Sequence, residues 1–144
     1  MKIGKVSQTV LKRSILKQLH YTRPESVIPA SMEEMCASVR TGENSQTVLT
    51  DACLYGNEKE LGVYAIARAV NDLASRGAEP VGMGVRLHLP PHAYESRLKS
   101  MTEYMEKAAS ENGVQLFYVK AEVSPVICTA MVSVSSVGYI TVGM

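Results

Sequence analysis

One stretch decides the fold, and it reads Tyr64-Ala-Ile-Ala-Arg-Ala-Val-Asn-Asp-Leu-Ala-Ser-Arg-Gly-Ala-Glu-Pro80. Apolar residues recur at helical spacing from Leu61 to Arg76, and Gly77 follows as a stop signal, so the pattern predicts a helix over 61–76. Beyond Pro80, apolar side chains occupy every second position from Val81 to Leu89. That period of two predicts a strand with one buried face.

Weaker patterns on both sides complete the predicted element order. We expect an amphipathic helix over 5–19, a connecting loop over 20–34, a second long helix over 93–112, and strands near 114–120 and 127–138. Segments 36–40 and 46–50 flank a stretch of turn-forming residues and are expected to form a hairpin. This order predicts an α+β two-layer sandwich, with a mixed or antiparallel sheet of about four strands and helices on one face.

The length and composition limit the class of protein. A chain of 144 residues fits a single domain, which we divide into a helix and loop over 1–34 and an α+β core over 35–144. The net charge of +1 provides no overall field for nucleic acid. No stretch approaches the ~20 consecutive apolar residues of a membrane helix, and the first residues lack the apolar run and cleavage site of a signal peptide, so we expect neither. Three scattered cysteines (Cys36, Cys53 and Cys128) argue against a disulfide framework or a zinc site, so we expect a cytoplasmic protein.

Two features leave alternatives open at this stage. Six basic residues precede Glu25, the first acidic one, and they either form a solvated face or steer the protein toward phosphates or an acidic partner. Gly82 and Gly84 alternate with the apolar residues of the strand, while Ser133 and Ser135 do the same in the last strand. Such a face of small residues either meets solvent or allows another sheet to approach closely.

The motif Asn-Asp-Leu-Ala-x-x-Gly-Ala-x-Pro at 71–80 resembles the aminoimidazole ribonucleotide (AIR) synthetase superfamily, particularly its hydrogenase-maturation branch. Flanking features that support the resemblance are Lys5-Val-Ser at the start, Leu87-His-Leu-Pro-Pro91, and Ala121-Glu-Val-Ser-Pro125. The resemblance covers nearly the whole chain. It implies an N-terminal domain whose carboxylates hold Mg²⁺ against the phosphates of ATP, beside glycine-rich loops that approach the nucleotide.

Carried over by this resemblance, five residues are candidates for the cofactor site. Asp51 and Asp72 would be the metal-binding carboxylates, and Asn71 belongs to the same motif as Asp72. Glu122 matches the glutamate that closes a glycine-rich loop of the family, and Lys120 lies two positions before it. ATP and Mg²⁺ are the cofactors that the resemblance implies.

Other positions depart from the family pattern. Cys36 stands where the family has a metal-binding aspartate, and Tyr118-Val119-Lys120 replaces the Gly-Gly pair and the residue after it. A soft thiolate is a poor ligand for Mg²⁺. A lysine about 4 Å from a divalent ion would cost roughly 8 kcal/mol, twice the ~4 kcal/mol of a unit-charge pair near a surface. Tyr118 would also fill the space that the nucleotide needs.

We therefore interpret the chain as a degenerate ATP-binding-type module without independent catalysis. The family resemblance further implies a homodimer, in which the two sheets join into a barrel. An alternative hypothesis is one half of a split Mg-ATP-dependent enzyme acting on an amide or carbamoyl group, with a separate C-terminal-domain polypeptide as its partner. A weaker one is a thiol-based activity at Cys36.

Overall fold

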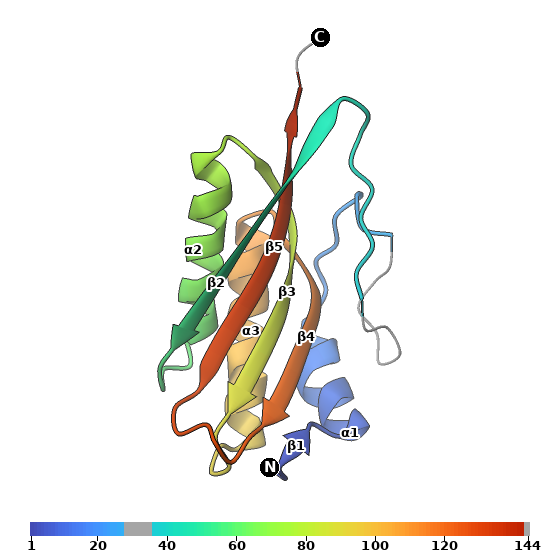
Figure 1. Cartoon of the computed structure of the whole chain (residues 1–144). Helices are drawn as coiled ribbons and strands as arrows, with labels where there is room; N and C mark the ends of the chain where they lie inside the picture. Colours follow the sequence, from blue (N-terminus) through green and yellow to red (C-terminus); the bar gives the residue numbers. More distant parts are fainter. Residues whose placement is uncertain (28–35, 143–144) are drawn as a thin grey trace.

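The computed structural model of the protein describes residues 1–27 and 36–142 as one sheet with helices on a single face (Figure 1). The strands are β1 (Gly4–Lys5), β2 (Ser45–Tyr55), β3 (Glu79–Leu89), β4 (Gln115–Val123) and β5 (Met131–Thr141). The two long helices are α2 (Leu61–Ser75) and α3 (Glu95–Glu111). The predicted α+β sandwich is confirmed, with a sheet of five strands because a short β1 adds to the predicted set.

The sheet is mixed and open, with the strand order β1-β4-β3-β5-β2. β3 and β4 are parallel and α3 connects them, whereas every other neighbouring pair is antiparallel. A parallel pair requires such a crossover, because the chain must return to the same end of the sheet before the second strand begins. β3 therefore lies in the middle of the sheet, between β4 and β5.

The predicted helix over 61–76 and the strand over 81–89 are both confirmed. α2 buries Leu61, Ala65, Ile66, Ala69 and Leu73 against the sheet, and Gly77 ends it with a φ of 71°. On β3, the side chains of Met83, Val85, Leu87 and Leu89 are at most 1% exposed and form the centre of the core beneath the helices. The period of two thus identified the buried face of β3 correctly.

The predicted hairpin between 36–40 and 46–50 is wrong. β2 instead pairs with β5 along its whole length, from Ser45 opposite Thr141 to Tyr55 opposite Met131. Val39 makes only an isolated bridge, to Ser26. Pairing with β5 places Ala52 opposite the buried Val134 in the core. Pairing with residues 36–40 would not make this contact. The turn-forming residues indicated a chain reversal but not the strand that receives the hydrogen bonds.

The single regular helix predicted over 5–19 is also wrong in its start and its regularity. Val6 donates its backbone N–H to Ala121 O (3.2 Å), so the chain begins as an edge strand on β4. Helical structure starts only after Ser7, whose hydroxyl caps the N–H of Val10. It consists of α1 (Gln8–Val10), a π-helical turn over Leu11–Ile15 and a 3₁₀ turn over Leu16–Gln18.

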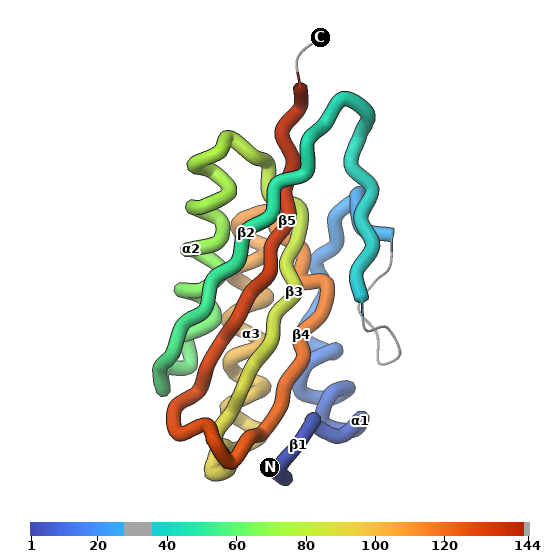
Figure 2. The backbone as a smooth tube through the Cα atoms, in the orientation of Figure 1, coloured from blue at the N-terminus to red at the C-terminus, as the bar shows by residue number. Residues whose placement is uncertain are grey.

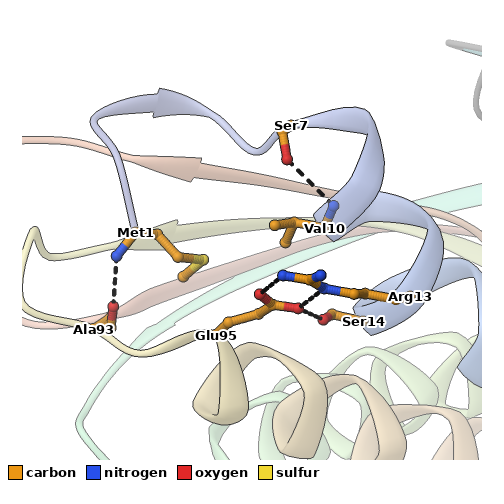
Figure 3. Close-up of polar contacts among 7 residues, drawn as sticks. All are labelled: Met1, Ser7, Val10, Arg13, Ser14, Ala93 and Glu95. Carbon is orange, nitrogen blue, oxygen red and sulfur yellow. Dashed lines mark hydrogen bonds and ion pairs between the residues drawn. The ribbon is translucent and has the colours of Figure 1, made fainter.

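This N-terminal segment is fastened to the start of α3 by a charged contact (Figure 3). The Arg13 guanidinium donates to both carboxylate oxygens of Glu95, at 2.6 and 2.5 Å, and the Ser14 hydroxyl donates to one of them. Met1 adds a bond from its amino group to Ala93 O (3.2 Å). Arg13, one of the six early basic residues, therefore has a structural partner.

Two buried polar side chains hold the next segment, residues 20–26. One oxygen of Glu106 on α3 accepts the backbone N–H groups of His20 and Tyr21, at 3.0 and 2.8 Å. Gln115 on β4 accepts the N–H of Arg23 (2.6 Å) and donates to Ser26 (3.1 Å). Residues 20–27 thereby run beside β4, and residues 36–40 lie next to them (Figure 2).

The two glycines of β3 lie beneath aromatic rings of the same chain. The register between β3 and β4 shifts after Met83, which leaves Phe117 as an extra residue on β4. Because of this bulge, two consecutive aromatic residues lie on the same face. A Cβ added at Gly82 would lie 2.2 Å from the Phe117 ring, and one at Gly84 would lie 2.1 Å from the Tyr118 ring. The absence of a side chain at these positions makes room for the rings.

A first prediction concerns the Arg13–Glu95 contact. The bonds from Arg13 and Ser14 lower the pKa of Glu95 from 4.5 to about 2. A carboxyl whose pKa is lower in the folded state stabilises the fold above its unfolded pKa and loses this effect as pH falls through its folded pKa. Glu95→Gln should therefore lower the melting temperature at pH 7, and the difference from the wild type should vanish between pH 4.5 and about 2. A constant difference over that range would contradict this account.

A second prediction concerns the packing of Tyr118 on β3. Gly84→Ala should displace the ring and reduce the free energy of unfolding by about 1–3 kcal/mol, although alanine suits a strand better than glycine does. Urea unfolding monitored by circular dichroism measures this difference. Gly42→Ala is the matched control, since a Cβ there would meet nothing within 4 Å. Equal effects of the two substitutions would show that the ring does not need the space at Gly84.

Candidate functional site

The sheet face turned away from α2 and α3, which we call the outer face, carries most of the candidate residues. Successive side chains of a strand point to opposite faces, so the neighbours of the core residues on β2, β3, β4 and β5 lie here. Its polar members from the four strands are, in order, Asp51 and Cys53, then Arg86 and His88, then Lys120 and Glu122, then Ser133 and Ser135. The outer face is therefore a polar surface of mixed charge.

One end of the outer face is covered by the chain itself. Val81, Phe117 and Val137 form a small apolar cluster there, and Ala37 and Val39 pack against it from the segment that follows residue 35. Beside this cluster, Tyr139 donates a hydrogen bond to Glu79, which raises the pKa of the tyrosine. Among residues 1–27 and 36–142, this cover does not extend over the rows of β3 from Gly84 to His88, which we call the open part of the face.

Lys120 lies on this open part, and its ammonium group is 4.6 Å from the centroid of the Tyr118 ring. A cation over the face of an aromatic ring is attracted by the negative charge of the π-system. Because the Tyr118 ring covers Gly84, the contact holds the lysine charge close to the sheet. The Tyr118 ring thus covers the backbone of β3 at Gly84, which has no side chain of its own to cover it.

Glu122 and His88 are register partners on β4 and β3, and a Glu122 oxygen lies 3.6 Å from His88 Nδ1. Half-exposed and next to an imidazole, this carboxylate forms an ion pair whenever the histidine is protonated. Lys120 and Glu122, both predicted site residues, therefore lie on the same strand and the same face. Lys120 lies over the Tyr118 ring, and Glu122 lies next to the His88 imidazole.

The two predicted metal carboxylates lie on different sides of β2. Asp51 is exposed on the outer face, opposite Ser135. Asp72 lies on α2, in the helix layer, and accepts a long hydrogen bond from the Thr50 hydroxyl (3.5 Å). Thr50 and Asp51 are adjacent in the strand, so their side chains leave it in opposite directions. Asn71 is exposed on α2 beside Asp72.

The predicted cysteine site is described only in part. Cys36 is exposed, as are Cys53 and Cys128. The rest of the segment that aligns with the family's glycine-rich run, residues 28–35, lies outside the described residues. Within residues 1–27 and 36–142, no three His, Cys, Asp or Glu side chains gather closely enough to hold a metal ion, and no helix is long and apolar enough to cross a membrane.

Arg86 is the residue that the sequence reasoning missed. It is the register partner of Lys120 on the neighbouring strand and is exposed on the outer face, with Ser133 opposite it on β5. The alternation of apolar and other residues in the sequence of β3 already indicates that Arg86 lies on the same face as Gly82 and Gly84. Its proximity to Lys120 depends on the β3–β4 register, which the local pattern does not reveal.

Comparisons with known proteins agree with this architecture. The family model described as "AIR synthase related protein, N-terminal domain" matches residues 31–140. The chain is 24% identical to a hydrogenase expression/formation protein of Methanocaldococcus jannaschii, over 97% of this chain and 43% of that protein.

Two solved structures share the fold at low sequence identity. One is the hydrogenase maturation protein HypE in complex with ATP, with a TM-score of 0.76 and 17% identity over 93% of this chain and 40% of that chain. The other is thiamine-monophosphate kinase from Stenotrophomonas maltophilia, with a TM-score of 0.72 and 19% identity over 95% of this chain and 43% of that chain. The chain thus spans less than half the length of these relatives.

The family model covers about three quarters of the residues, and the motif at 71–80 lies within it, at the end of α2 and the start of β3. The predicted resemblance, including that to the hydrogenase-maturation proteins, is confirmed by these matches. This chain belongs to the AIR synthase related proteins and contains their N-terminal domain.

Proposed function

We propose that this chain is a homodimeric, ATP-binding-type module that has lost the ordinary Mg-ATP chemistry of its family and does not catalyse a reaction by itself. ATP is the natural ligand to consider, because one structural relative was solved with ATP and another is a kinase. The main observation behind the proposal is the position of Tyr118. Its ring covers Gly84, and the Lys120 ammonium group lies over the ring.

The described residues fit a magnesium triphosphate poorly. Mg²⁺ is a small, hard ion that needs near-octahedral oxygen ligands, commonly one or two carboxylates with phosphate and water. Asp51 and Asp72 leave β2 and α2 on different sides of the sheet, so one ion cannot readily use both. Lys120 adds a positive charge beside Glu122, the third candidate carboxylate, and opposes binding of a divalent cation there. These positions therefore do not support a catalytic step through Mg-ATP in this chain.

The homodimer is supported by the asymmetry of the two sheet faces. Helices α2 and α3 cover one face, whereas the outer face includes the exposed apolar side chains of Leu49 and Tyr55 on β2. A second sheet packed on this face would cover these two exposed apolar side chains. Association of two such faces would produce the barrel-like arrangement that the family resemblance implies.

A split enzyme is the alternative. The relatives extend well beyond the matched region, with this chain covering 43% of the hydrogenase expression/formation protein and 40% of HypE. A separate polypeptide carrying the remaining part could complete a nucleotide cleft, with Asn71 and Asp72 on the exposed end of α2 contributing to it. Copurification of such a polypeptide, together with ATP hydrolysis by the mixture, would favour this alternative.

The loss of Mg-ATP binding is tested by isothermal titration calorimetry. We expect no saturable binding of Mg-ATP at micromolar concentrations, because Tyr118 and Lys120 occupy the region above Gly84. Asp72→Ala serves as the matched variant and should behave like the wild type. Micromolar binding that Asp72→Ala abolishes would refute the proposal and assign the carboxylate a role in the nucleotide site.

The homodimer is tested by sedimentation velocity over a range of concentrations. The wild-type chain should sediment as a dimer of 15.7 kDa protomers at micromolar concentration. A stable monomer throughout that range would contradict the proposal for the isolated chain.

A further inference from the structure

Three exposed apolar side chains gather at the end of the sheet where β3 and β4 finish (Figure 1). Tyr94 follows the turn after β3 and is 77% exposed, Val126 lies in the turn after β4 and is 82% exposed, and Ile3, just before β1, is 63% exposed. Among the described residues, Val126 and Tyr94 have the two highest exposures of any large apolar side chain. We call the end of the molecule formed by residues 1–5, 90–94 and 124–127 the tip.

Backbone hydrogen bonds hold the three segments of the tip in place. The amino group of Met1 donates to Ala93 O (3.2 Å), which fixes the N-terminus beside the turn that precedes Tyr94 (Figure 3). Ser124 donates its N–H to Leu89 O (3.0 Å), which ties the turn carrying Val126 to the end of β3. Binding through these side chains therefore does not require the segments to be ordered first, which lowers its entropic cost.

Lysines surround the apolar residue nearest the N-terminus. Lys2 and Lys5 flank Ile3, and Lys12 and Lys17 follow in the helical turns beyond β1. All four lysines are exposed, and no side-chain hydrogen bond or ion pair joins any of them to a residue of 1–27 or 36–142. Their ammonium groups are therefore available to a negatively charged partner.

The acidic residues near the tip do not cancel this charge. Glu95 is held by the guanidinium and hydroxyl bonds described above. Glu122 is the register partner of Lys5, but its carboxylate lies 3.6 Å from the His88 ring. The acidic residues of 56–60 follow β2, which is at the opposite edge of the sheet from β1. The β1 side of the tip therefore carries more positive than negative charge.

This combination of groups fits the surface of an anionic membrane. Aliphatic side chains enter the boundary between lipid headgroups and acyl chains, tyrosine is enriched at that level, and neighbouring lysines are attracted to lipid phosphates. Nucleic acid is recognised mainly through arginine forks, and both arginines of the N-terminal segment, Arg13 and Arg23, are bound to glutamates of this chain. Apolar side chains that project from three separate turns suit a planar, fluid surface better than a single acidic peptide segment.

We propose that the tip binds reversibly to the surface of an anionic membrane, with Ile3, Tyr94 and Val126 at the level of the headgroups and Lys2 and Lys5 against lipid phosphates. The binding is reversible because a few apolar side chains and lysines provide far less anchoring than a membrane-spanning helix. The contact is at the end of the sheet, so it depends neither on the homodimer nor on the nucleotide chemistry proposed above.

Vesicle flotation with the full chain tests the charged part of the contact. At physiological ionic strength the chain should float with vesicles of equal parts phosphatidylglycerol and phosphatidylcholine, and should not float with phosphatidylcholine alone. Lys2→Gln/Lys5→Gln should lower the partition coefficient about thirtyfold, because each lysine near an anionic surface contributes about fivefold. Lys107→Gln is the matched control, since this exposed lysine lies about 18 Å further along α3 than Glu95, beyond the Debye length of about 8 Å.

The apolar part of the contact is tested separately. Val126→Ser should lower the partition coefficient at least about fivefold, because the favourable transfer of the valine side chain out of water is lost. Val142→Ser is the matched control, since Val142 is 40% exposed and directly follows the far end of β5. The chain contains no tryptophan. Tyr94→Trp therefore provides a single fluorescent reporter, whose emission should shift to shorter wavelength with the anionic vesicles.

Circular dichroism melting verifies that each variant is folded. A wild-type chain that does not float with the anionic vesicles would overturn the inference, as would flotation that leaves the emission of Tyr94→Trp unchanged. Sensitivity to the lysine substitutions alone, with Val126→Ser indistinguishable from Val142→Ser, would also overturn it and would point instead to a soluble acidic partner. None of these results bears on the homodimer, which sedimentation velocity tests independently.

Discussion

The alternation of β3 is the constraint on which both faces of the molecule depend. Each side chain that enters the core under α2 and α3 obliges its neighbour to lie on the outer face. Met83, Val85 and Leu87 are fully buried in this way, and the intervening positions are Gly82, Gly84 and Arg86. Because β3 lies between β4 and β5, the same alternation determines which residues of those strands face outward. The core and the polar outer face are therefore two consequences of one pattern.

The bulge at Phe117 interrupts this alternation on β4, next to Gly82 and Gly84 of β3. An extra residue on β4 directs two consecutive aromatic side chains to one face, and the two glycines of β3 accept them. Phe117 joins an apolar cluster that residues 36–40 help to cover, while Tyr118 extends over Gly84 toward the open part of the face. Glycine in a strand costs stability through its backbone freedom. Here that cost is offset by ring packing within the chain itself.

The sequence predicted the long elements well and the long-range pairings poorly. α2, β3 and α3 have strong local periodicity, and their bounds agree with the predictions within two residues at most ends. The predicted hairpin is wrong because β2 pairs with β5, whose residues lie 76 to 96 positions further along the chain. The helix over 5–19 failed because a bond from Val6 to Ala121 draws the chain onto the edge of β4. Both failures arise from contacts that no local window contains.

The same limit applies to the candidate site. Asp51, Asp72, Lys120 and Glu122 were chosen by motif, and a motif does not state on which side of a sheet a residue lies. Strand parity places Asp51 on the outer face and Thr50, the partner of Asp72, on the opposite one. Arg86 was overlooked because its importance depends on a register with Lys120 that only the folded sheet establishes. Asp51 and Asp72 therefore do not face a common site, which the motif alone could not show.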